Sequence, residues 1–469
     1  MRVTVVGSGP NGLAAAAVLA RAGAEVTVLE AQATIGGGTR TSDLTDQGLL
    51  HDHCSAVHPL AAGSPGLTAL ALHEHGLRWC QPEVDLAHPL DDGSAGVLLK
   101  SLNRTAAGLG VDGPTWADVV GPAAAHLPAL LGEVMRPPLH LPRHPLVLTR
   151  YGLGALPPAT RRARTFRTEQ ARALFGGLAA HSMQPLTAPG TSAIAVLLAA
   201  AAHRFGWVVA QGGSRAITDA LARVVTSNGG RIHTGVNVQS LGDAGQFDAL
   251  VLNLSPTAAA NLLGDRLPGR VRRAFESWRY GPAAFKVDFS VHAGVPWTSE
   301  AARRAGTVHL GGTLAQTAAA EAEVAAGRMP TRPFVLVGQQ YLADPSRSNA
   351  DLHPVWAYAH VPHGYTGDAT AAVIAQIERF APGFGDRISR THVRSATALA
   401  RDNPNYVGGD IATGASTLRQ LLVRPRLAVD PYSVGVPGIY LSSAATPPGP
   451  GVHAMAGCNV AEIILRRHR

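Results

Sequence analysis

The first 30 residues contain a strand, a glycine-rich turn, a helix and a second strand in direct succession. Val3–Val6 is a β-branched run that leads into Gly7-Ser8-Gly9-Pro10-Asn11-Gly12 and then into Leu13–Ala20, an apolar segment typical of a helix. A second β-branched run, Glu25–Leu29, ends at Glu30. This order predicts a βαβ unit, and therefore an α/β fold that begins with a Rossmann-like domain.

Each glycine of the turn has a separate physical role in such a unit. Gly7 permits the tight turn out of the strand, Gly9 lets the backbone approach a diphosphate, and Gly12 lets the helix pack closely on the strand. The helix that opens at Pro10-Asn11 offers free N–H groups and about half a positive charge to phosphates. Glu30 is placed to accept hydrogen bonds from both hydroxyls of a ribose. The sequence thus predicts a dinucleotide site without a 2′-phosphate.

The composition is that of a large globular protein. A chain of 469 residues has room for two or three domains, and 46% hydrophobic with only 15% charged residues excludes a disordered chain. The net charge of +8 comes almost wholly from arginine, since Lys100 and Lys286 are the only lysines, which indicates a nucleotide-composition bias. We find no zinc-finger spacing or aromatic–basic interleaving, so we expect no nucleic-acid partner.

The number and spacing of the cysteines and the length of the apolar runs exclude further classes of protein. Cys54, Cys80 and Cys458 are too scattered for a disulfide framework, and without a CxxC motif a dithiol-dependent disulfide reductase is excluded. The longest apolar run, Ala193–Ala202, is too short to span a bilayer. Because a predicted strand begins at Val3, we expect no cleavable signal and a cytoplasmic location.

Helical segments and a second group of strands are expected after the opening unit. Ala-, Leu- and Arg-rich helical segments fill Leu67–Phe205. In Ala283–Val291, apolar residues alternate with Lys286, Asp288 and Ser290, which predicts a strand with two different faces. The other predicted elements are a helix at Arg215–Ser227 and strands at Arg231–Val238, Phe247–Leu254, Phe334–Gln339, Val355–Val361 and Gly438–Leu441.

Further glycine-rich loops link the opening motif to a known family. Gly36–Thr41 (GGGTRT) follows Glu30 closely, and Ser443–Val452 (SAATPPGPGV) precedes the last helix. With these loops, and with Gly212-Gly213-Ser214 and the segment that ends at Val238, the chain resembles the phytoene desaturase-like branch of the FAD-dependent amine oxidase superfamily over essentially its whole length. Asp344–Arg347 (DPSR) and Trp356–Tyr358 (WAY) resemble NAD(P)/FAD-dependent oxidoreductases of that branch.

The resemblance implies FAD as the cofactor and a particular division of the chain. It implies a glutathione reductase-type, FAD-binding Rossmann-like domain, interleaved with an α+β substrate domain that has a mixed or antiparallel sheet and a helical lid. The expected boundaries are residues 1–75, 205–255 and 430–469 for the discontinuous FAD-binding domain, 76–204 for the helical lid and 256–429 for the substrate domain. No second glycine-rich βαβ unit occurs, so we expect no dedicated nicotinamide site.

Three departures from the family pattern concern fine contacts to the cofactor. Gly38 stands where many relatives carry an arginine, a role that Arg40 could fill; Pro447 replaces a histidine; and Ala444-Ala445 lacks the acid that amine oxidases place on the ribityl chain. The cofactor-binding residues that the motif and the resemblance indicate are Gly7, Gly9, Pro10, Asn11, Gly12, Glu30, Ala31, Gly37, Gly38, Thr39, Arg40, Val238, Ala445, Gly451 and Val452.

Lys286, His453 and His58 are the candidate catalytic residues. In amine oxidases a lysine on a similar strand holds a water against flavin N5, and the resemblance carries this role to Lys286. The alternation itself favours a second interpretation, in which Lys286 and Asp288 form the solvated face of the strand, because burying an unpaired ammonium costs several kcal/mol. Both interpretations stay open.

The histidine-rich stretch has three interpretations. His51-Asp52-His53-Cys54 suggests a metal site, but no distant His/Cys pair completes a tetrahedral set, and we expect no metal. Ser55 or His58 lining an active site is the second interpretation, and ordinary packing is the third. His453, beside the predicted flavin loop, is a better candidate to face the substrate.

A set of arginines flanks the apolar helical region that ends near Arg204. These arginines form either a solvated surface or a membrane-surface patch through which a lipid enters. They are Arg150, Arg161, Arg162, Arg164, Arg167 and Arg172.

We therefore predict a flavin desaturase or dehydrogenase. It transfers a hydride from a C–H bond of an apolar, isoprenoid- or polyene-like small molecule to flavin N5, and an acceptor such as oxygen or a quinone takes the electrons. Alternatives from the same superfamily are an amine or amino-acid oxidase and a flavin-dependent saturase or isomerase. A non-enzymatic relative of the Rab GDP-dissociation inhibitors is a further alternative, against which the intact glycines and Glu30 argue.

Overall fold

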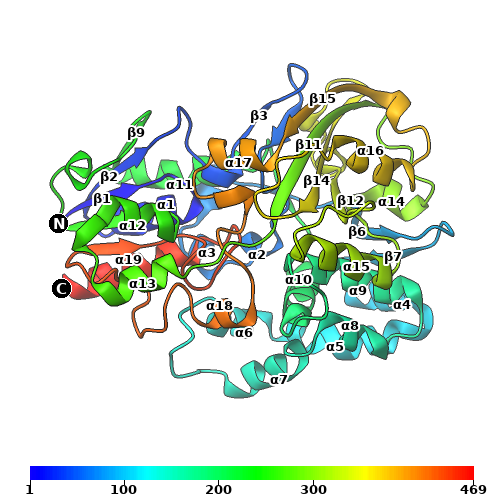
Figure 1. Ribbon diagram of the computed structural model, residues 1–469, viewed down its shortest axis with the longest axis horizontal. Helices are drawn as coiled ribbons and strands as arrows, with labels where there is room; N and C mark the ends of the chain where they lie inside the picture. Colours follow the sequence, from blue (N-terminus) through cyan, green and yellow to red (C-terminus); the bar gives the residue numbers. More distant parts are fainter. Residues whose placement is uncertain (469) are drawn as a thin grey trace.

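Short apolar strands from both ends and the middle of the chain meet in one parallel sheet. In spatial order it consists of β16 (Ile439–Leu441), β10 (Ala249–Leu252), β1 (Arg2–Val6), β2 (Glu25–Glu30) and β9 (Arg231–Thr234), and all neighbouring pairs are parallel. In the computed structural model, which describes residues 1–468, the two ends of the chain lie close together at this sheet (Figure 1). Arg469, the last residue of the expected FAD-binding domain, lies outside the described residues.

Helices cover both faces of the parallel sheet. On one face α1 (Pro10–Arg21), α11 (Arg215–Ser227) and α19 (Met455–Arg467) pack on valines of β1 and β2. On the other face α12 (Pro256–Leu263) and α13 (Gly269–Glu276) pack on leucines of β10 and β16. Parallel strands need this double cover because their backbone and apolar side chains are shielded from water on both sides.

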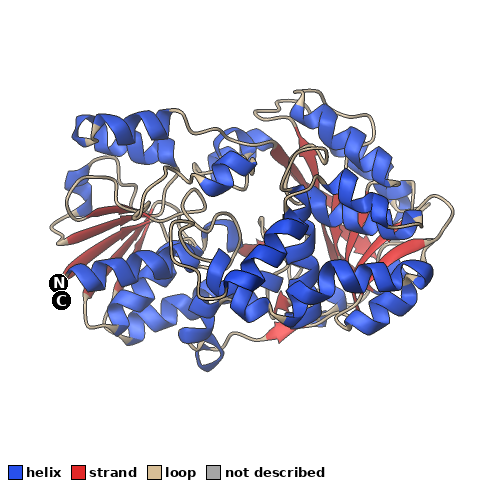
Figure 2. Cartoon of the chain, turned by 90° about the horizontal axis from the view of Figure 1, so that it is seen from below, coloured by secondary structure: helices blue, strands red, loops and turns tan. Residues whose placement is uncertain are grey.

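A second sheet of seven strands occupies the opposite end of the molecule (Figure 2). All neighbouring pairs are antiparallel except β12 and β6, so the sheet is mixed, one of the two forms, mixed or antiparallel, that the family resemblance implied. In spatial order the strands are β15 (Ile388–Arg394), β11 (Ala283–His292), β14 (Leu352–Val361), β13 (Val335–Gly338), β12 (Ala305–Leu310), β6 (Val84–Pro89) and β7 (Ala95–Leu98).

The two faces of this mixed sheet differ in chemistry, and both are covered. Phe285, Val287 and Phe289 of β11 belong to an apolar core with α14 (Glu300–Arg304) and α16 (Thr370–Glu378). On the opposite face the β11–β14 register pairs Lys286 with Tyr358 and Asp288 with Trp356. Lys286 and Asp288 are buried, so the interpretation of a solvated face is wrong.

A helical layer covers that second face. Its members pack on Leu86 of β6, Leu336 of β13 and Trp356 of β14. The helices that follow one another between residues 102 and 205 are α4 (Leu102–Gly108), α5 (Gly113–Ala125), α6 (Leu127–Val134), α7 (Pro145–Ala155), α8 (Ala159–Arg162), α9 (Glu169–Ala180) and α10 (Thr191–Phe205), and α15 (Leu314–Ala325) packs against α9.

The structure departs from the expected domain boundaries at two places. β6 and β7 fall within 76–204 yet extend the mixed sheet, because β6 pairs in parallel with β12. α12 and α13 fall within 256–429 yet cover the parallel sheet, because their apolar faces complete its second core. Short apolar segments of this kind do not reveal from sequence which sheet they will join.

The remaining elements are short. They are β3 (Thr41–Asp43), β4 (Leu50–Asp52), β5 (Trp79–Cys80), β8 (Val209–Ala210), α2 (Pro59–Ala62), α3 (Pro65–Ala69), α17 (Ala396–Asp402), α18 (Leu418–Leu422) and 3-10 turns at Gly37–Thr39, Leu72–His75, Gly110–Asp112, Ala163–Thr165, Leu241–Ala244, Gly264–Arg266, Gln340–Leu342, Pro345–Arg347, Gly385–Arg387 and Val407–Gly409. No helix within residues 1–468 combines the length and the apolarity that crossing a bilayer requires.

A network of buried charged side chains joins several of these short segments to one another. The Arg347 guanidinium donates to the Asp52 carboxylate at 2.6 Å, to Asp344 at 3.2 Å and to the carbonyl of Ala210 at 2.8 Å. Asp52 also accepts a hydrogen bond from the backbone N–H of Ser214 at 2.7 Å, where α11 begins. Burial alone would raise the pKa of Asp52, but the Arg347 charge and these hydrogen bonds lower it, so the pair is ionised.

We expect Arg347→Met to destabilise the fold by about 3–5 kcal/mol, because it leaves the Asp52 carboxylate buried without its counter-charge. Urea denaturation measures the change. Arg304→Met is the matched control, since Arg304 is 47% exposed in its ion pair with Glu83 and should change stability by about 1 kcal/mol or less. Equal midpoints for Arg347→Met and the wild type would contradict a structural role for the network.

Candidate cofactor and substrate site

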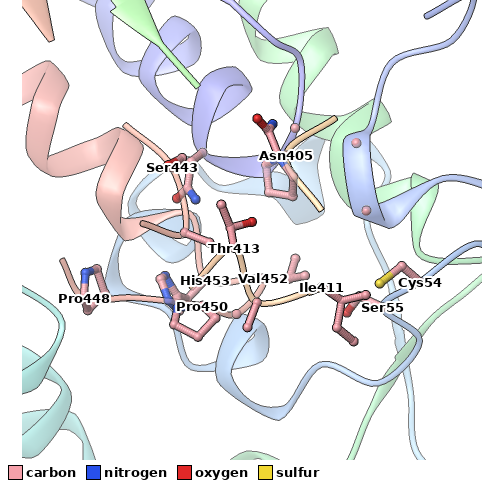
Figure 3. Close-up of a pocket in the computed structure, with 18 of the residues that line it drawn as sticks. Cys54, Ser55, Asn405, Ile411, Thr413, Ser443, Pro448, Pro450, Val452 and His453 are labelled. Atoms are coloured by element: carbon pink, nitrogen blue, oxygen red, sulfur yellow. The ribbon is translucent and has the colours of Figure 1, made fainter. Parts of the chain in front are cut away.

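One cavity of about 1150 Å³ runs between the two sheets and is lined from both ends of the chain. Gly7, Gly9 and Glu30 line it from the opening βαβ unit, and Trp356 and Tyr358 line it from the mixed sheet. In Figure 3, Pro448, Pro450, Val452 and His453 of the C-terminal loop lie across the pocket from Cys54 and Ser55. Most of the predicted cofactor residues therefore line one end of a larger space, Gly12 and Ala445 being the exceptions.

Close backbone packing explains the glycines of the first turn. Gly7 has φ +94°, a conformation that side chains disfavour. A Cβ at Gly12 would overlap the carbonyl oxygen of Gly7, so this glycine holds α1 against β1 without lining the cavity. The Asn253 side chain, at the carboxyl end of β10, donates to the same carbonyl at 3.3 Å. α1 has no acidic residue in its first turn, which leaves its positive end free to face an anion.

The second glycine loop lies on the first. The backbone N–H of Gly36 donates to the carbonyl of Ser8 at 3.2 Å, and a Cβ at Gly37 would lie 3.0 Å from the Cα of Gly9. The Tyr406 hydroxyl occupies the space that a side chain at Gly38 would need. This contact gives a steric reason for glycine where many relatives carry arginine.

Arg40 borders the cavity and is anchored to the same loop. Its guanidinium donates to the carbonyl oxygens of Gly37 at 3.1 Å and Asp402 at 3.2 Å, while Thr39 and Gly38 also line the cavity. The Arg40 charge thus lies at the cofactor end of the cavity. This position is consistent with the suggestion that Arg40 replaces the arginine that the family pattern has at the position of Gly38.

Glu30 lines the cavity, but most of its acceptor capacity is already used. Its Oε2 accepts from the Ser8 N–H at 2.8 Å and from the Ser8 hydroxyl at 2.6 Å, and its Oε1 accepts from the Gln32 N–H at 2.9 Å. A carboxylate has about four acceptor directions. One direction, on Oε1, remains for a ligand, whereas the sequence analysis expected Glu30 to accept from two ribose hydroxyls. Ala31 and Val238 line the cavity next to it.

The C-terminal loop closes the same end of the cavity. Gly451, Val452 and His453 line it, and a Cβ at Gly457 of α19 would overlap the carbonyl oxygen of Asn11, so the last helix packs directly on α1. Ala445 is buried behind the lining, with its N–H donated to the Ser443 hydroxyl at 3.2 Å. Ser443 and Ala444 line the cavity in its place.

The two candidate catalytic histidines both border the cavity and are held by hydrogen bonds. His58 Nε2 lies 2.8 Å from the Ser214 hydroxyl, and His453 Nδ1 accepts from the Met455 N–H at 3.2 Å. Burial lowers the pKa of each imidazole to about 4. Both rings are therefore neutral at pH 7 and present a polar but uncharged surface.

The neighbouring histidines, His51 and His53, are each within hydrogen-bond distance of a hydroxyl group. His51 Nε2 lies 2.9 Å from the Thr45 hydroxyl, and His53 Nε2 lies 2.7 Å from the Ser42 hydroxyl. Within residues 1–468 no group of three or more His, Cys, Asp or Glu side chains is arranged to hold a metal ion. Cys54 and Ser55, which follow these histidines in the chain, line the cavity.

Lys286 lies behind the cavity wall. Its ammonium is buried against the Asp288 carboxylate and lies 5.7 Å from the ring centre of Trp356, which does line the cavity. Burial lowers the pKa of Lys286, and the Asp288 charge only partly opposes this. Burial would raise the pKa of Asp288, but the Lys286 charge and a hydrogen bond from His51 bring it to about 2. The partner that a buried ammonium requires is thus Asp288.

Several lining residues were missed by the sequence analysis. Trp356 and Tyr358, which the sequence marks only by a family resemblance, form an edge-to-face pair with ring centres 5.0 Å apart. His181 also lines the cavity, with its Nε2 3.0 Å from His309 Nε2. Asn253 could have been inferred, because it lies next to the last residue of the predicted strand Phe247–Leu254 and ligands bind at the carboxyl ends of parallel strands. The aromatic pair and His181 gave no comparable indication.

The comparisons with known proteins agree with this architecture. Residues 5–71 match the model of an NAD(P)-binding Rossmann-like domain. The chain is 25% identical over 298 residues to the rat (Rattus norvegicus) pyridine nucleotide-disulfide oxidoreductase domain-containing protein 2, an alignment that covers 55% of this chain. The chain spans about half (51%) of the length of that relative.

Solved structures match nearly the whole chain. An oxidoreductase from Methanosarcina mazei has a TM-score of 0.63 at 17% identity and covers 98% of this chain and 100% of its own. A putrescine oxidase has a TM-score of 0.63 at 18% identity, with both chains covered completely. The chain is thus built on the fold of these oxidoreductases. The predicted α/β fold, with a Rossmann-like dinucleotide-binding domain, is confirmed.

We expect Gly12→Ala to weaken the binding of added FAD at least about tenfold, which corresponds to roughly 1.4 kcal/mol, because the new Cβ forces α1 away from β1 and Gly7. Fluorescence quenching of FAD on titration into apoprotein measures the affinity. Gly108→Ala in α4 is the matched control, since a Cβ there meets no atom within 4 Å. Unchanged affinity in Gly12→Ala would rule out this packing as a requirement for the site.

Proposed function

We propose that this protein is an FAD-dependent oxidoreductase that removes a hydride from a C–H bond of an elongated apolar small molecule. The observation that carries the proposal is the continuity of the cavity, in which a dinucleotide end opens directly into a space lined mainly by apolar side chains. These include Val134, Met135, Leu148, Met183, Ile194, Leu197, Leu198, Leu336 and Ile411.

The residues of the cofactor end fit FAD in charge and in shape. Gly7, Gly9 and the start of α1 would hold the diphosphate, and the free acceptor of Glu30 would hold a ribose hydroxyl. Ala31 and Val238 would border the adenine, while the Gly37–Arg40 loop and Gly451-Val452 would border the flavin. FAD-dependent enzymes are among the solved structures that share this fold. When bound, FAD supplies the acceptor for a hydride.

The contribution of the chain to such chemistry is orientation and the exclusion of water. The apolar wall binds the substrate chain along its length, so that one C–H bond is held at the flavin end of the cavity. His58 and His453 are neutral at pH 7, and Lys286 is held by Asp288 behind the cavity wall, so none of the three candidate catalytic residues presents a free charge to the substrate. Electrons would leave to an acceptor such as oxygen or a quinone.

Amine oxidation is the second candidate, and the Trp356–Tyr358 pair is the observation that favours it. Aromatic faces bind ammonium groups. However, the Lys286 ammonium already lies 5.7 Å from the centre of the Trp356 ring, so this ring already has a cation as a neighbour. The acidic residues that line the cavity are Glu30, Glu133 and Asp402, and Glu133 already accepts from His140 and the N–H groups of Arg143 and His144. An uncharged substrate therefore fits better.

We expect the purified protein to be yellow, to release flavin on denaturation, and to bleach anaerobically with an acyclic polyisoprenoid such as phytoene. Putrescine and cyclohexylamine are the amine probes, and peroxide release with either would favour amine oxidation. Product mass separates the remaining alternatives, because desaturation removes two hydrogens, saturation adds two and isomerisation changes nothing. A colourless protein that FAD cannot reconstitute would end the proposal.

We expect Leu197→Asn to slow bleaching by the polyisoprenoid about tenfold or more, because it places an amide in the apolar wall, while FAD content stays unchanged. Glu30→Leu should instead lower the FAD content of the purified protein, because it removes an acceptor from the cofactor end of the cavity. Spectra of the purified variants and stopped-flow bleaching measure the two effects. Loss of FAD from Leu197→Asn would show that this wall belongs to the cofactor site.

A further inference from the structure

Leucines on α7 and just before it are left in solvent. Leu141 is 91% exposed, Leu146 84% and Leu153 74%, and among the 11 residues of α7 only Ala155 is buried. Monomeric soluble proteins rarely leave large apolar side chains together in water. We refer to Leu139, Leu141, Leu146 and Leu153, all exposed, as the leucine surface; Leu156, also exposed, lines the cavity.

The charged residues in the segment that carries the leucine surface are arginines, without Asp or Glu. Leu146, Arg150 and Leu153 are spaced at i, i+4 and i+7, so they share one face of α7, and all three are exposed. Arg143, just before the helix, is exposed as well. Residues 134–168 contain seven arginines and no Asp or Glu. Within the described chain neither Arg143 nor Arg150 has an acidic group within 4 Å of its guanidinium nitrogens.

The opposite side of the same helix forms the wall of the cavity. Leu148, Tyr151 and Ala155 line it, and Leu418 and Leu422 of α18 line it from the neighbouring segment. Leu422 is also exposed. In Figure 1, α7 lies at the lower edge of the molecule, outside the two sheets. One short helix therefore separates the apolar end of the cavity from the leucine surface.

We propose that the leucine surface docks the protein on a bilayer that contains anionic lipids. Leucines of a short surface helix can enter the boundary of the acyl chains while arginines on the same face meet the phosphates. A second copy of this chain is a poorer occupant, because a two-fold interface would place these arginines beside their own counterparts without an acid to pair them. Docking itself does not depend on the proposed function.

A consequence follows if the proposed function also holds. An apolar substrate dissolved in the bilayer would then reach the cavity past α7 and α18 without crossing water. The arginines that flank the apolar region in the sequence fall into two groups, those that hydrogen-bond to the protein backbone and those that face solvent. Arg162 and Arg172 are tied to the backbone carbonyls of Gly154 and Phe166, while Arg150 remains on the leucine surface.

Co-sedimentation with vesicles tests the docking. We expect the full chain, with or without FAD, to sediment with vesicles of phosphatidylcholine and phosphatidylglycerol, more weakly with phosphatidylcholine alone, and less in high salt because salt screens the arginines. Leu153→Asp should lower the partition coefficient about tenfold or more, the effect expected for replacing one inserted leucine by a charge. Arg143→Gln with Arg150→Gln should remove most of the preference for anionic vesicles.

Val111→Asp is the matched control, since Val111 is 65% exposed in the Gly110–Asp112 turn and lies outside the leucine surface. It should bind vesicles as the wild type does, and thermal unfolding should show that all variants are folded. No sedimentation of the wild type, or equal losses in Leu153→Asp and Val111→Asp, would overturn the proposal. A dimer in sedimentation equilibrium that Leu153→Asp dissolves, without vesicle binding, would assign the surface to a second copy instead.

Discussion

The buried Arg347–Asp52 ion pair is the interaction on which the arrangement of the two sheets depends. It joins a segment next to β14 to the β4 strand, and through Ser214 and Ala210 to the start of α11 and to β8. Two charges can lie in a dry interior only if their remaining hydrogen-bonding groups are also satisfied. The network meets that condition with backbone groups from several segments, so it fixes their relative positions as well as their charge state.

The cavity follows from this arrangement, since neither sheet forms it alone. The parallel sheet contributes backbone, glycines and one carboxylate, which suit a polar, anionic ligand. The mixed sheet and the helical layer contribute apolar and aromatic side chains. Because the two environments meet in one continuous space, the function proposed above puts a polar cofactor and an apolar substrate in contact there. The polar face of the mixed sheet is buried for the same reason, with Lys286 neutralised by Asp288.

The sequence indicated residues at the glycine-rich end of the cavity more readily than residues at its apolar end. Gly7, Gly9, Glu30 and the C-terminal loop were found because a strand, a turn and a helix impose local conformations that particular residues satisfy. In the sequence Trp356 and Tyr358 show only a family resemblance and His181 carries no signal, because a register between strands and a helix packed against them make these residues line the cavity. Lys286 shows the same limit: alternation identified its face, but not what covers that face.

The sequence by itself determined the βαβ start, the alternation in β11, the glycines that close packing demands and the excess of arginine around α7. These properties depend on neighbours along the chain, where sterics and periodicity act directly. Tertiary structure alone decided that β6 and β7 join the mixed sheet, that α12 and α13 cover the parallel one, and that Tyr406 occupies the space beside Gly38. Those outcomes depend on which apolar surfaces meet, and many segments of similar hydrophobicity compete for the same partners until the whole chain is packed.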